Sequence, residues 1–300
     1  MAAPSDQRRA YAHAAAAVLL WSTVASAFKL SLRHLRPDAL LLWANASSAA
    51  VLGLAAAVAG KLRELRGLSR RDLFQRAVLG LLNPCLYYLV LFRAYDLLPA
   101  QEAQPLNYTW AVTLALLSIP LLGQRIGWRG IGAMLVSYAG VVVIATRGDP
   151  LALRFESPTG VGLALASTVI WALFWIYDRR STGDPLVGLL VSFAASLPVV
   201  LLENVIVGGA PRLPAWPGLA GAAYIGAFEM GVTFVLWSRA LKLSETTARV
   251  GNLIFFSPFL SLVLIRFLVG EEILASSVVG LGFIVAGNVL QQLASRRTPT

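Results

Sequence analysis

The sequence predicts an all-helical integral membrane protein with ten transmembrane helices. Of its 300 residues 57% are hydrophobic and only 13% are charged, whereas a soluble domain carries about 25% charged residues. The apolar residues form long continuous runs, each of about the 20 residues that an α-helix needs to cross the hydrocarbon core. A membrane β-barrel would instead show alternating segments of roughly 10 residues. The connections between the runs are short, so no extramembrane domain is expected.

Each predicted helix is one apolar run bounded by polar, basic or proline-containing residues. The first run lacks a small-residue cleavage site and is long enough to span, so we expect it to stay as a helix and not to be removed as a signal peptide. The longest connection is the basic stretch 61–76. The predicted spans are 11–33, 38–60, 74–96, 100–122, 128–146, 158–178, 185–207, 216–241, 245–268 and 273–294.

The basic residues predict how these spans are oriented. Of the 25 Lys and Arg residues, 17 fall on the side that carries the N-terminus, the even-numbered connections and the C-terminus. Connections rich in Lys and Arg stay on the cytoplasmic side of a membrane. Both termini are therefore expected in the cytoplasm, and the bilayer is an expected partner.

The two halves of the chain, 1–147 and 148–300, repeat the same order of features. The stretch "RAYDLLPAQEAQPLNYTW" from Arg93 corresponds to "RALKLSETTARVGNLIFF" from Arg239, and "YAGVVV" corresponds to "VAGNVL". Because each half contributes five spans, an odd number, the second half enters the membrane from the opposite side. Inverted repeats of this kind are typical of secondary transporters that alternate access around a site near the bilayer midplane.

Several function classes are excluded or disfavoured by the residues. No phosphate-binding G-x-x-x-x-G-K-[ST] loop is present, and no nucleophile is paired with a base, so neither ATP-driven pumping nor an enzyme is expected. A single cysteine, Cys85, and two histidines make a metal site or cofactor unexpected. The net charge of +10 follows from the connections between spans and does not indicate nucleic-acid binding.

Polar and aromatic residues inside the spans are the candidates for substrate binding. Asn107 and Tyr108, with Gln104, share a helix face by their spacing, and Trp171 and Trp175 lie one turn apart deep in the sixth span. The alternative for the tryptophans is packing or an interfacial belt, and for the asparagines a hydrogen bond to a neighbouring helix. The predicted substrate-binding residues are Asn107, Tyr108, Trp110, Trp171, Trp175, Glu229, Asn252 and Phe256.

Prolines and small residues predict two further properties of the helices. Pro84, Pro105 and Pro258 interrupt the third, fourth and ninth spans, where they are expected either to set kinks or to act as hinges. Small residues such as Gly140 and Gly280 recur in the fifth and tenth spans, which favours close packing of these two helices.

Glu229 is the sharpest feature, because it lies near the middle of the apolar run 216–241. A central acidic residue costs about 2.5–3.5 kcal/mol on insertion scales, so it needs a partner or a watery surrounding. One interpretation is a structural hydrogen bond to another helix, with Arg249 as a candidate partner. The other is a cavity carboxylate that meets a cationic group of the substrate or carries a coupling proton.

The chain resembles the drug/metabolite transporter superfamily, and its EamA-type ten-helix members in particular. The resemblance rests on the order of "LLWSTVASAFK", "NYTW", "LLGQRIGW", "IWALFW", "RALKLSETTA" and "FLVGEE", and within the family it is nearest to bacterial YddG-type amino-acid exporters. It implies a basket of ten helices around a central cavity in the inner membrane, with Tyr108, Trp110 and Trp171 in the cavity. "NPCLYY" and Glu229 depart from the family pattern, which leaves the substrate range open.

The sequence thus predicts a secondary transporter that exports amino acids, aromatic or of a broader range, and related metabolites by alternating access. An exporter of drugs or other small metabolites is the first alternative, and a membrane scaffold or an intramembrane enzyme ranks lower. Proton coupling is left open, and the protein is expected to be a monomer, with a dimer as the alternative.

Overall fold

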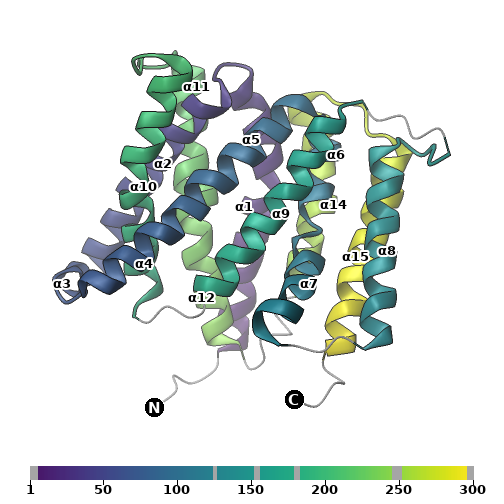
Figure 1. The fold of residues 1–300 in the computed structure, drawn as a ribbon, viewed down its shortest axis with the longest axis horizontal. Coiled ribbons are helices and arrows are strands. Elements are labelled where there is room, and N and C mark those ends of the chain that lie inside the picture. The colour runs from purple at the N-terminus through teal and green to yellow at the C-terminus, as the bar shows by residue number, and fades with distance from the viewer. Residues whose placement is uncertain (1–5, 124–126, 152–155, 179–182, 245–251, 296–300) are drawn as a thin grey trace. The chain divides into compact units, whose positions relative to one another are not determined.

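A computed structural model describes residues 6–123, 127–151, 156–178, 183–244 and 252–295. In these ranges the chain is helical and contains no strand (Figure 1). The elements are α1 (Gln7–Leu32), α2 (Pro37–Val58), α3 (Leu62–Leu65), α4 (Arg70–Gly80), η1 (Leu81–Leu86), α5 (Tyr87–Leu97), α6 (Ala100–Asn107), α7 (Trp110–Leu122), α8 (Trp128–Ala145), α9 (Pro158–Asp178), α10 (Pro185–Gly208), α11 (Trp216–Tyr224), η2 (Ile225–Val232), α12 (Thr233–Leu243), η3 (Asn252–Phe256), α14 (Ser257–Leu264), η4 (Ile265–Val269) and α15 (Ala275–Ser295).

The predicted spans and the observed helices agree closely. Within the described ranges, nine helical segments are long and apolar enough to cross a membrane, and the helix Leu253–Val269 is a shorter apolar one. The predicted ends of spans two, six and seven lie within a few residues of α2, α9 and α10. The ninth predicted span begins at residue 245, and its first seven residues lie outside the described part of the chain. The ten-helix membrane fold predicted from the sequence is confirmed.

The helix starts follow local sequence rules. Asp184 caps α10 by accepting hydrogen bonds from the N–H groups of Leu186 and Val187, at 2.9 and 3.3 Å, and proline follows as the first helical residue. α2 likewise begins with Pro37. Proline suits this position because its missing N–H would have no partner in the first turn.

The chain divides into two compact units, each of which combines helices from both sequence halves. Unit 1 comprises Met1–Cys85 and Ser181–Leu264, and unit 2 comprises Leu86–Arg180 and Ile265–Thr300. This division by packing is different from the division into repeats 1–147 and 148–300, which remains a prediction.

Unit 1 is built around α1, α2 and α10. α1 packs against α12 and α14, while α2 packs against α10 and η2, and α10 also packs against α4. Its core contains fully buried Phe28, Leu40, Leu52 and Phe193. Buried polar side chains cross-link these helices, as where the Nδ2 group of Asn45 in α2 donates to Ser196 Oγ in α10 over 2.9 Å.

Unit 2 is built around α9 and the pair α8 and α15. α9 packs against α5, α6 and α7, and α15 packs along α8 (Figure 1). A Cβ atom on Gly140 would lie 2.4 Å from the carbonyl oxygen of Gly280, and a Cβ on Gly280 would lie 2.7 Å from the carbonyl oxygen of Gly140. Only glycines allow the two backbones to approach this closely. The predicted packing of the fifth and tenth spans is confirmed.

The helix pairs inside the units form matching sets: the most extensive contacts of the spans in one sequence half have equivalents when the two halves are interchanged. The first span packs with the eighth (α1 with α12), and the sixth packs with the third (α9 with α5). The second packs with the eighth (α2 with η2), and the seventh packs with the third (α10 with α4). When the two sequence halves are interchanged, the second–seventh and fifth–tenth pairs stay the same. This is the packing pattern expected of the predicted repeats 1–147 and 148–300, and the repeats themselves remain a prediction.

Candidate functional site

Unit 2 contains a cluster of stacked aromatic side chains. We call Tyr87, Trp171, Phe174 and Trp175 the aromatic cluster. The last three lie on one face of α9 at i, i+3 and i+4. The ring centroids of Tyr87 and Trp171 are 4.5 Å apart with an interplanar angle of 31°, and those of Trp171 and Trp175 are 5.7 Å apart at 83°. The first pair is tilted, and the second has the edge-to-face arrangement that aromatic pairs prefer.

A chain of hydrogen bonds joins the aromatic cluster to α6. The Tyr87 hydroxyl donates to Asn107 Oδ1 over 3.3 Å, and Asn107 Nδ2 donates to Ser167 Oγ over 2.9 Å. Ser167 in turn donates to the carbonyl oxygen of Ala164 over 2.7 Å. Asn107 therefore ties α5, α6 and α9 together, which makes it a positioning residue for the cluster in this arrangement.

The fourth span is broken next to this cluster. α6 ends at Asn107 and α7 begins at Trp110, so Tyr108 and Thr109 form the break. Pro105, inside α6, lacks an N–H and cannot continue the helical hydrogen bonds. The carbonyl of Tyr108 accepts a hydrogen bond from Asn288 Nδ2 of α15 over 3.2 Å. A side chain from a neighbouring helix thus satisfies backbone that a broken membrane helix leaves free.

Buried polar atoms without a hydrogen-bond partner lie on three helices of unit 2, one of which, α9, carries most of the aromatic cluster. Among the described residues of unit 2 they include Gln104 Oε1 on α6, Trp175 Nε1 on α9 and Asn288 Oδ1 on α15. α6 packs against both α9 and α15. A buried polar group without a partner costs about 1–3 kcal/mol, so such groups indicate a place where a ligand or water completes the bonding. The set offers two carbonyl acceptors and one N–H donor.

Glu229 lies in unit 1, on the π-helical segment η2. This segment packs against α2, where Ser48 Oγ donates to the carbonyl oxygen of Met230 over 3.1 Å. Gly226 lies directly against the backbone of Ala44, because an added Cβ would be 2.2 Å from its carbonyl oxygen. Glu229 itself is half-buried. π-helical segments occur frequently at functional sites, and this one coincides with the carboxylate that the sequence singled out. Arg249 lies outside the described residues.

The other predicted residues are distributed over both units. Trp110 begins α7 in unit 2 and is half-buried. Phe256 ends η3 in unit 1 and is 65% exposed, while the side chain of Asn252 lies outside the described part of the structure. Pro258 is the second residue of α14 and is buried.

Pro84 lies where the third span is interrupted. The residue before it, Asn83, has φ −143° and ψ 117°, which is extended and not helical. Residues before a proline favour this conformation. The interruption falls within η1 in the third span, and η2 occupies the eighth span, which is its counterpart if the predicted repeats hold. The broken fourth span and the irregular ninth span, with η3 and η4, correspond in the same way.

Several residues that these units bring together were not predicted from the sequence. Tyr87, Ser167 and Asn288 were missed because their partners lie far away in the sequence; the paired tyrosines of "NPCLYY" were the available signal. In unit 1, Asp38 is 4% exposed and accepts from Arg36 Nη2 at 2.7 Å and from Asn204 Nδ2 at 2.9 Å. An acidic residue at the start of an apolar run was the signal here.

These features define a class of protein: a multi-pass helical membrane protein whose third, fourth, eighth and ninth spans contain irregular helix within the described ranges. Comparison with known families agrees. The model of the EamA-like transporter family matches residues 8–146 and 158–291. The chain belongs to the EamA-like transporter family.

Individual relatives have a similar length. The chain is 28% identical over 300 aligned positions to the aromatic amino acid exporter YddG of Ancylobacter novellus, covering 94% of this chain and 96% of that protein. It is 23% identical to YddG of Salmonella typhimurium, covering 66% and 69%. An uncharacterised transporter of Clostridium kluyveri is 25% identical, with 79% and 77% covered. A solved crystal structure of a protein superposes with a TM-score of 0.63 over 98% of this chain and all of that chain, at 22% identity, and supports the fold.

Proposed function

We propose that the protein exports amino acids, including aromatic ones, across the bacterial inner membrane and binds them at the aromatic cluster of unit 2. The observation that carries this proposal is the combination, on packed helices of one unit, of stacked aromatic rings with buried polar atoms that lack partners. The names of the two YddG relatives support the same substrate class.

The chemistry of the cluster fits the two ends of an amino acid. The carbonyl oxygens of Gln104 and Asn288 accept hydrogen bonds from an ammonium group, and the indole N–H of Trp175 donates one to a carboxylate. The hydrogen bond from Asn288 Nδ2 to the Tyr108 carbonyl fixes the amide so that its oxygen remains available. Trp171 and Tyr87 offer ring faces to an aromatic or aliphatic side chain.

The proposed mechanism is alternating access by two inverted five-helix repeats, with both termini in the cytoplasm. Three observations support it: the family model matches once in each half, the most extensive helix contacts match when the halves are interchanged, and the irregular helices occur at corresponding positions. Discontinuous helices at matching positions are the usual pointer to a transporter's binding site. The breaks at Pro84, Pro105 and Pro258 are the proposed hinges.

Glu229 is proposed to carry a coupling proton or to meet a cationic substrate group. Its place on the π-helical segment η2 supports this role. In proteoliposomes, Glu229→Gln should abolish the dependence of transport on a pH gradient while the protein still inserts and folds. Unchanged counterflow and unchanged pH dependence in this variant would remove Glu229 from the mechanism.

Counterflow in proteoliposomes tests the proposed substrate class. Vesicles that contain the wild-type protein are loaded with one unlabelled compound, and uptake of its labelled form is followed for a panel of amino acids, cationic drugs and other small metabolites. We expect aromatic amino acids to exchange several-fold faster than in protein-free vesicles. Exchange of drugs alone would reassign the substrate class, and no exchange across the panel would contradict transport by this chain alone.

A further inference from the structure

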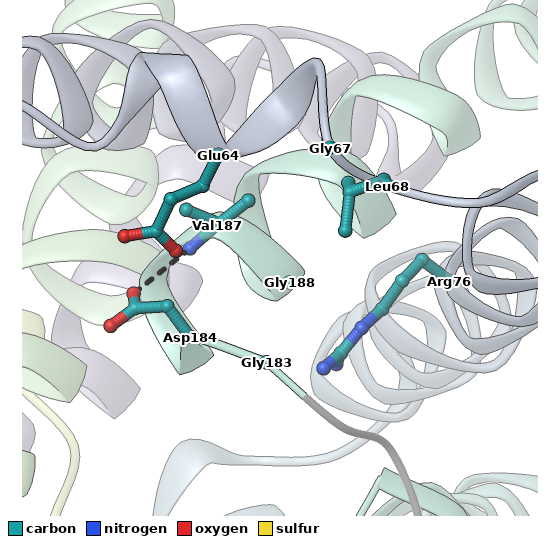
Figure 2. Close-up of a pocket in the computed structure, with 8 residues that line it drawn as sticks. All are labelled: Glu64, Gly67, Leu68, Arg76, Gly183, Asp184, Val187 and Gly188. Carbon is teal, nitrogen blue, oxygen red and sulfur yellow. Dashed lines mark hydrogen bonds between the residues drawn. The ribbon is translucent and has the colours of Figure 1, made fainter.

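A pocket of about 280 Å³ in unit 1 lies where α4 and α10 begin (Figure 2). One wall is Arg76 of α4, which is only 8% exposed. Its guanidinium lies against the backbone of Gly188 in the first turn of α10, where an added Cβ would be 2.4 Å from Arg Cζ. A guanidinium has five N–H donors in a planar fork that matches phosphate and carboxylate oxygens. This wall is suited to an anionic group.

The opposite wall carries two carboxylates. Asp184 caps α10 and forms an ion pair with Lys61. Burial alone would raise the pKa of Asp184, but hydrogen bonds from Lys61 and from the α10 backbone outweigh it and lower the pKa below its ordinary value. Glu64 points toward Asp184 in Figure 2 and is exposed. Since Lys61 neutralises Asp184, Glu64 supplies the negative charge that this wall offers to a cation.

The location of the pocket restricts what reaches it. The helical segments Arg70–Leu97 and Pro185–Gly208 both qualify as membrane spans, so their N-terminal ends lie at a bilayer surface. On α3 and α4, which each contribute a residue to the pocket lining, Leu62 and Phe74 are 43% and 72% exposed, and Arg63 and Arg66 in the same segment are exposed as well. Apolar and basic side chains together at this level suit a phospholipid better than a soluble molecule.

We propose that this pocket binds the headgroup of a zwitterionic phospholipid of the phosphatidylethanolamine type. The phosphate lies against the Arg76 guanidinium, the primary ammonium lies against the Glu64 carboxylate, and the acyl chains leave the pocket past Leu68 of its lining. A primary ammonium donates hydrogen bonds to a carboxylate, whereas the quaternary ammonium of phosphatidylcholine has no N–H to donate. The pocket therefore distinguishes these two lipids.

Thermal unfolding and native mass spectrometry of the full chain test this proposal. The purified protein in detergent is supplemented with phosphatidylethanolamine, phosphatidylcholine or phosphatidylglycerol of identical acyl chains. We expect phosphatidylethanolamine to raise the unfolding midpoint by about 2–4 °C more than phosphatidylcholine, and one phosphatidylethanolamine to remain bound in the mass spectrum.

The variants separate this pocket from general lipid effects. Glu64→Gln should remove the difference between phosphatidylethanolamine and phosphatidylcholine, and Arg76→Gln should remove the bound lipid. Arg66→Gln, a change in the same basic segment outside the pocket lining, should leave both readouts unchanged. If Arg76→Gln does not fold, Glu64→Gln decides the question because Glu64 is exposed. A phosphatidylethanolamine preference that survives in Glu64→Gln would overturn the proposal.

Soluble compounds with the same charges distinguish a lipid from a free zwitterion. Phosphoethanolamine and free amino acids are added to the detergent-solubilised protein at millimolar concentration. We expect neither to reproduce the stabilisation, because neither has acyl chains. An equal, Glu64-dependent shift with a free amino acid would overturn the lipid assignment and identify the pocket as a site for soluble zwitterions.

Discussion

The ion pair between Glu102 and Arg147 positions the start of α6 in unit 2, and its removal has a calculable effect. The side chain of Glu102 is 2% exposed and that of Arg147 is 41% exposed, with 2.8 Å between Oε1 and Nε. Removing one partner of a buried pair costs about 3–5 kcal/mol, because the other charge remains buried. Because the guanidinium is half-exposed, water enters the space that it leaves. Arg147→Met should therefore reduce the free energy of unfolding by an amount near the lower end of this range, about 3 kcal/mol. The carboxylate of Glu271, which caps α6 through the N–H groups of Ala100 and Gln101 at 2.8 and 3.1 Å, lies at the same helix end and adds to this cost.

The assay is the unfolding midpoint in detergent, followed by tryptophan fluorescence. At about 2–4 °C per kcal/mol, Arg147→Met should lower the midpoint by about 6–12 °C. Glu156→Gln is the matched control, because it removes the second ion pair of Arg147, whose partners are 41% and 46% exposed; exposed pairs contribute about 0–1 kcal/mol. Adding Glu102→Gln to Arg147→Met should recover at least half of the loss. An Arg147→Met midpoint within 2 °C of wild type, or a double variant no more stable than the single one, would show that the ion pair does not stabilise this helix end.

Other contacts inside the units make the folded protein sensitive to single substitutions. Asp184→Asn should lower the unfolding midpoint above pH 4. Because the pKa of folded Asp184 lies below its ordinary value of 3.8, the stability that the carboxylate contributes is complete above that pH and is lost as the pH falls further. A difference in midpoint from wild type that shrinks between pH 7 and 5 would contradict this prediction. Gly280→Ala should strongly reduce folded yield, because its Cβ would meet Ile144 Cγ1 at 2.4 Å, whereas Gly282→Ala meets nothing within 4 Å and should be neutral; equal yields would count against the close packing of α8 and α15. Asn107→Ala removes two side-chain hydrogen bonds of about 0.6 kcal/mol each, and a midpoint drop as large as that of Arg147→Met would show that Asn107 does more than position the aromatic cluster.

The membrane spans were predictable from the sequence because a bilayer imposes one length and one composition on every helix. The i, i+4 spacing of Trp171 and Trp175 also correctly placed them on one helix face, and their rings lie in contact. Glycines in the fifth and tenth spans correctly indicated a close helix pair, since small residues at this spacing have few other uses in a membrane helix.

The partners of the candidate residues were not predictable in the same way. Asn107 meets Ser167 across 60 residues and Tyr108 meets Asn288 across 180, and one sequence contains no signal for such pairs. The π-helical segment around Glu229 was equally hidden, and so was the close contact of its Gly226 with the backbone of α2. Local sequence patterns predict the number and order of the membrane helices. The hydrogen-bond partners of each polar group depend on tertiary contacts.

The most direct test of the proposed amino-acid site is counterflow of labelled phenylalanine with Trp171 substituted. If phenylalanine stacks on this ring, Trp171→Phe should transport with nearly wild-type affinity, and Trp171→Ala should raise the half-saturating concentration about tenfold, equivalent to about 1.4 kcal/mol. Unfolding midpoints of both variants control for loss of folding. Equal half-saturating concentrations for wild type and Trp171→Ala, with both proteins folded, would contradict substrate binding at the aromatic cluster.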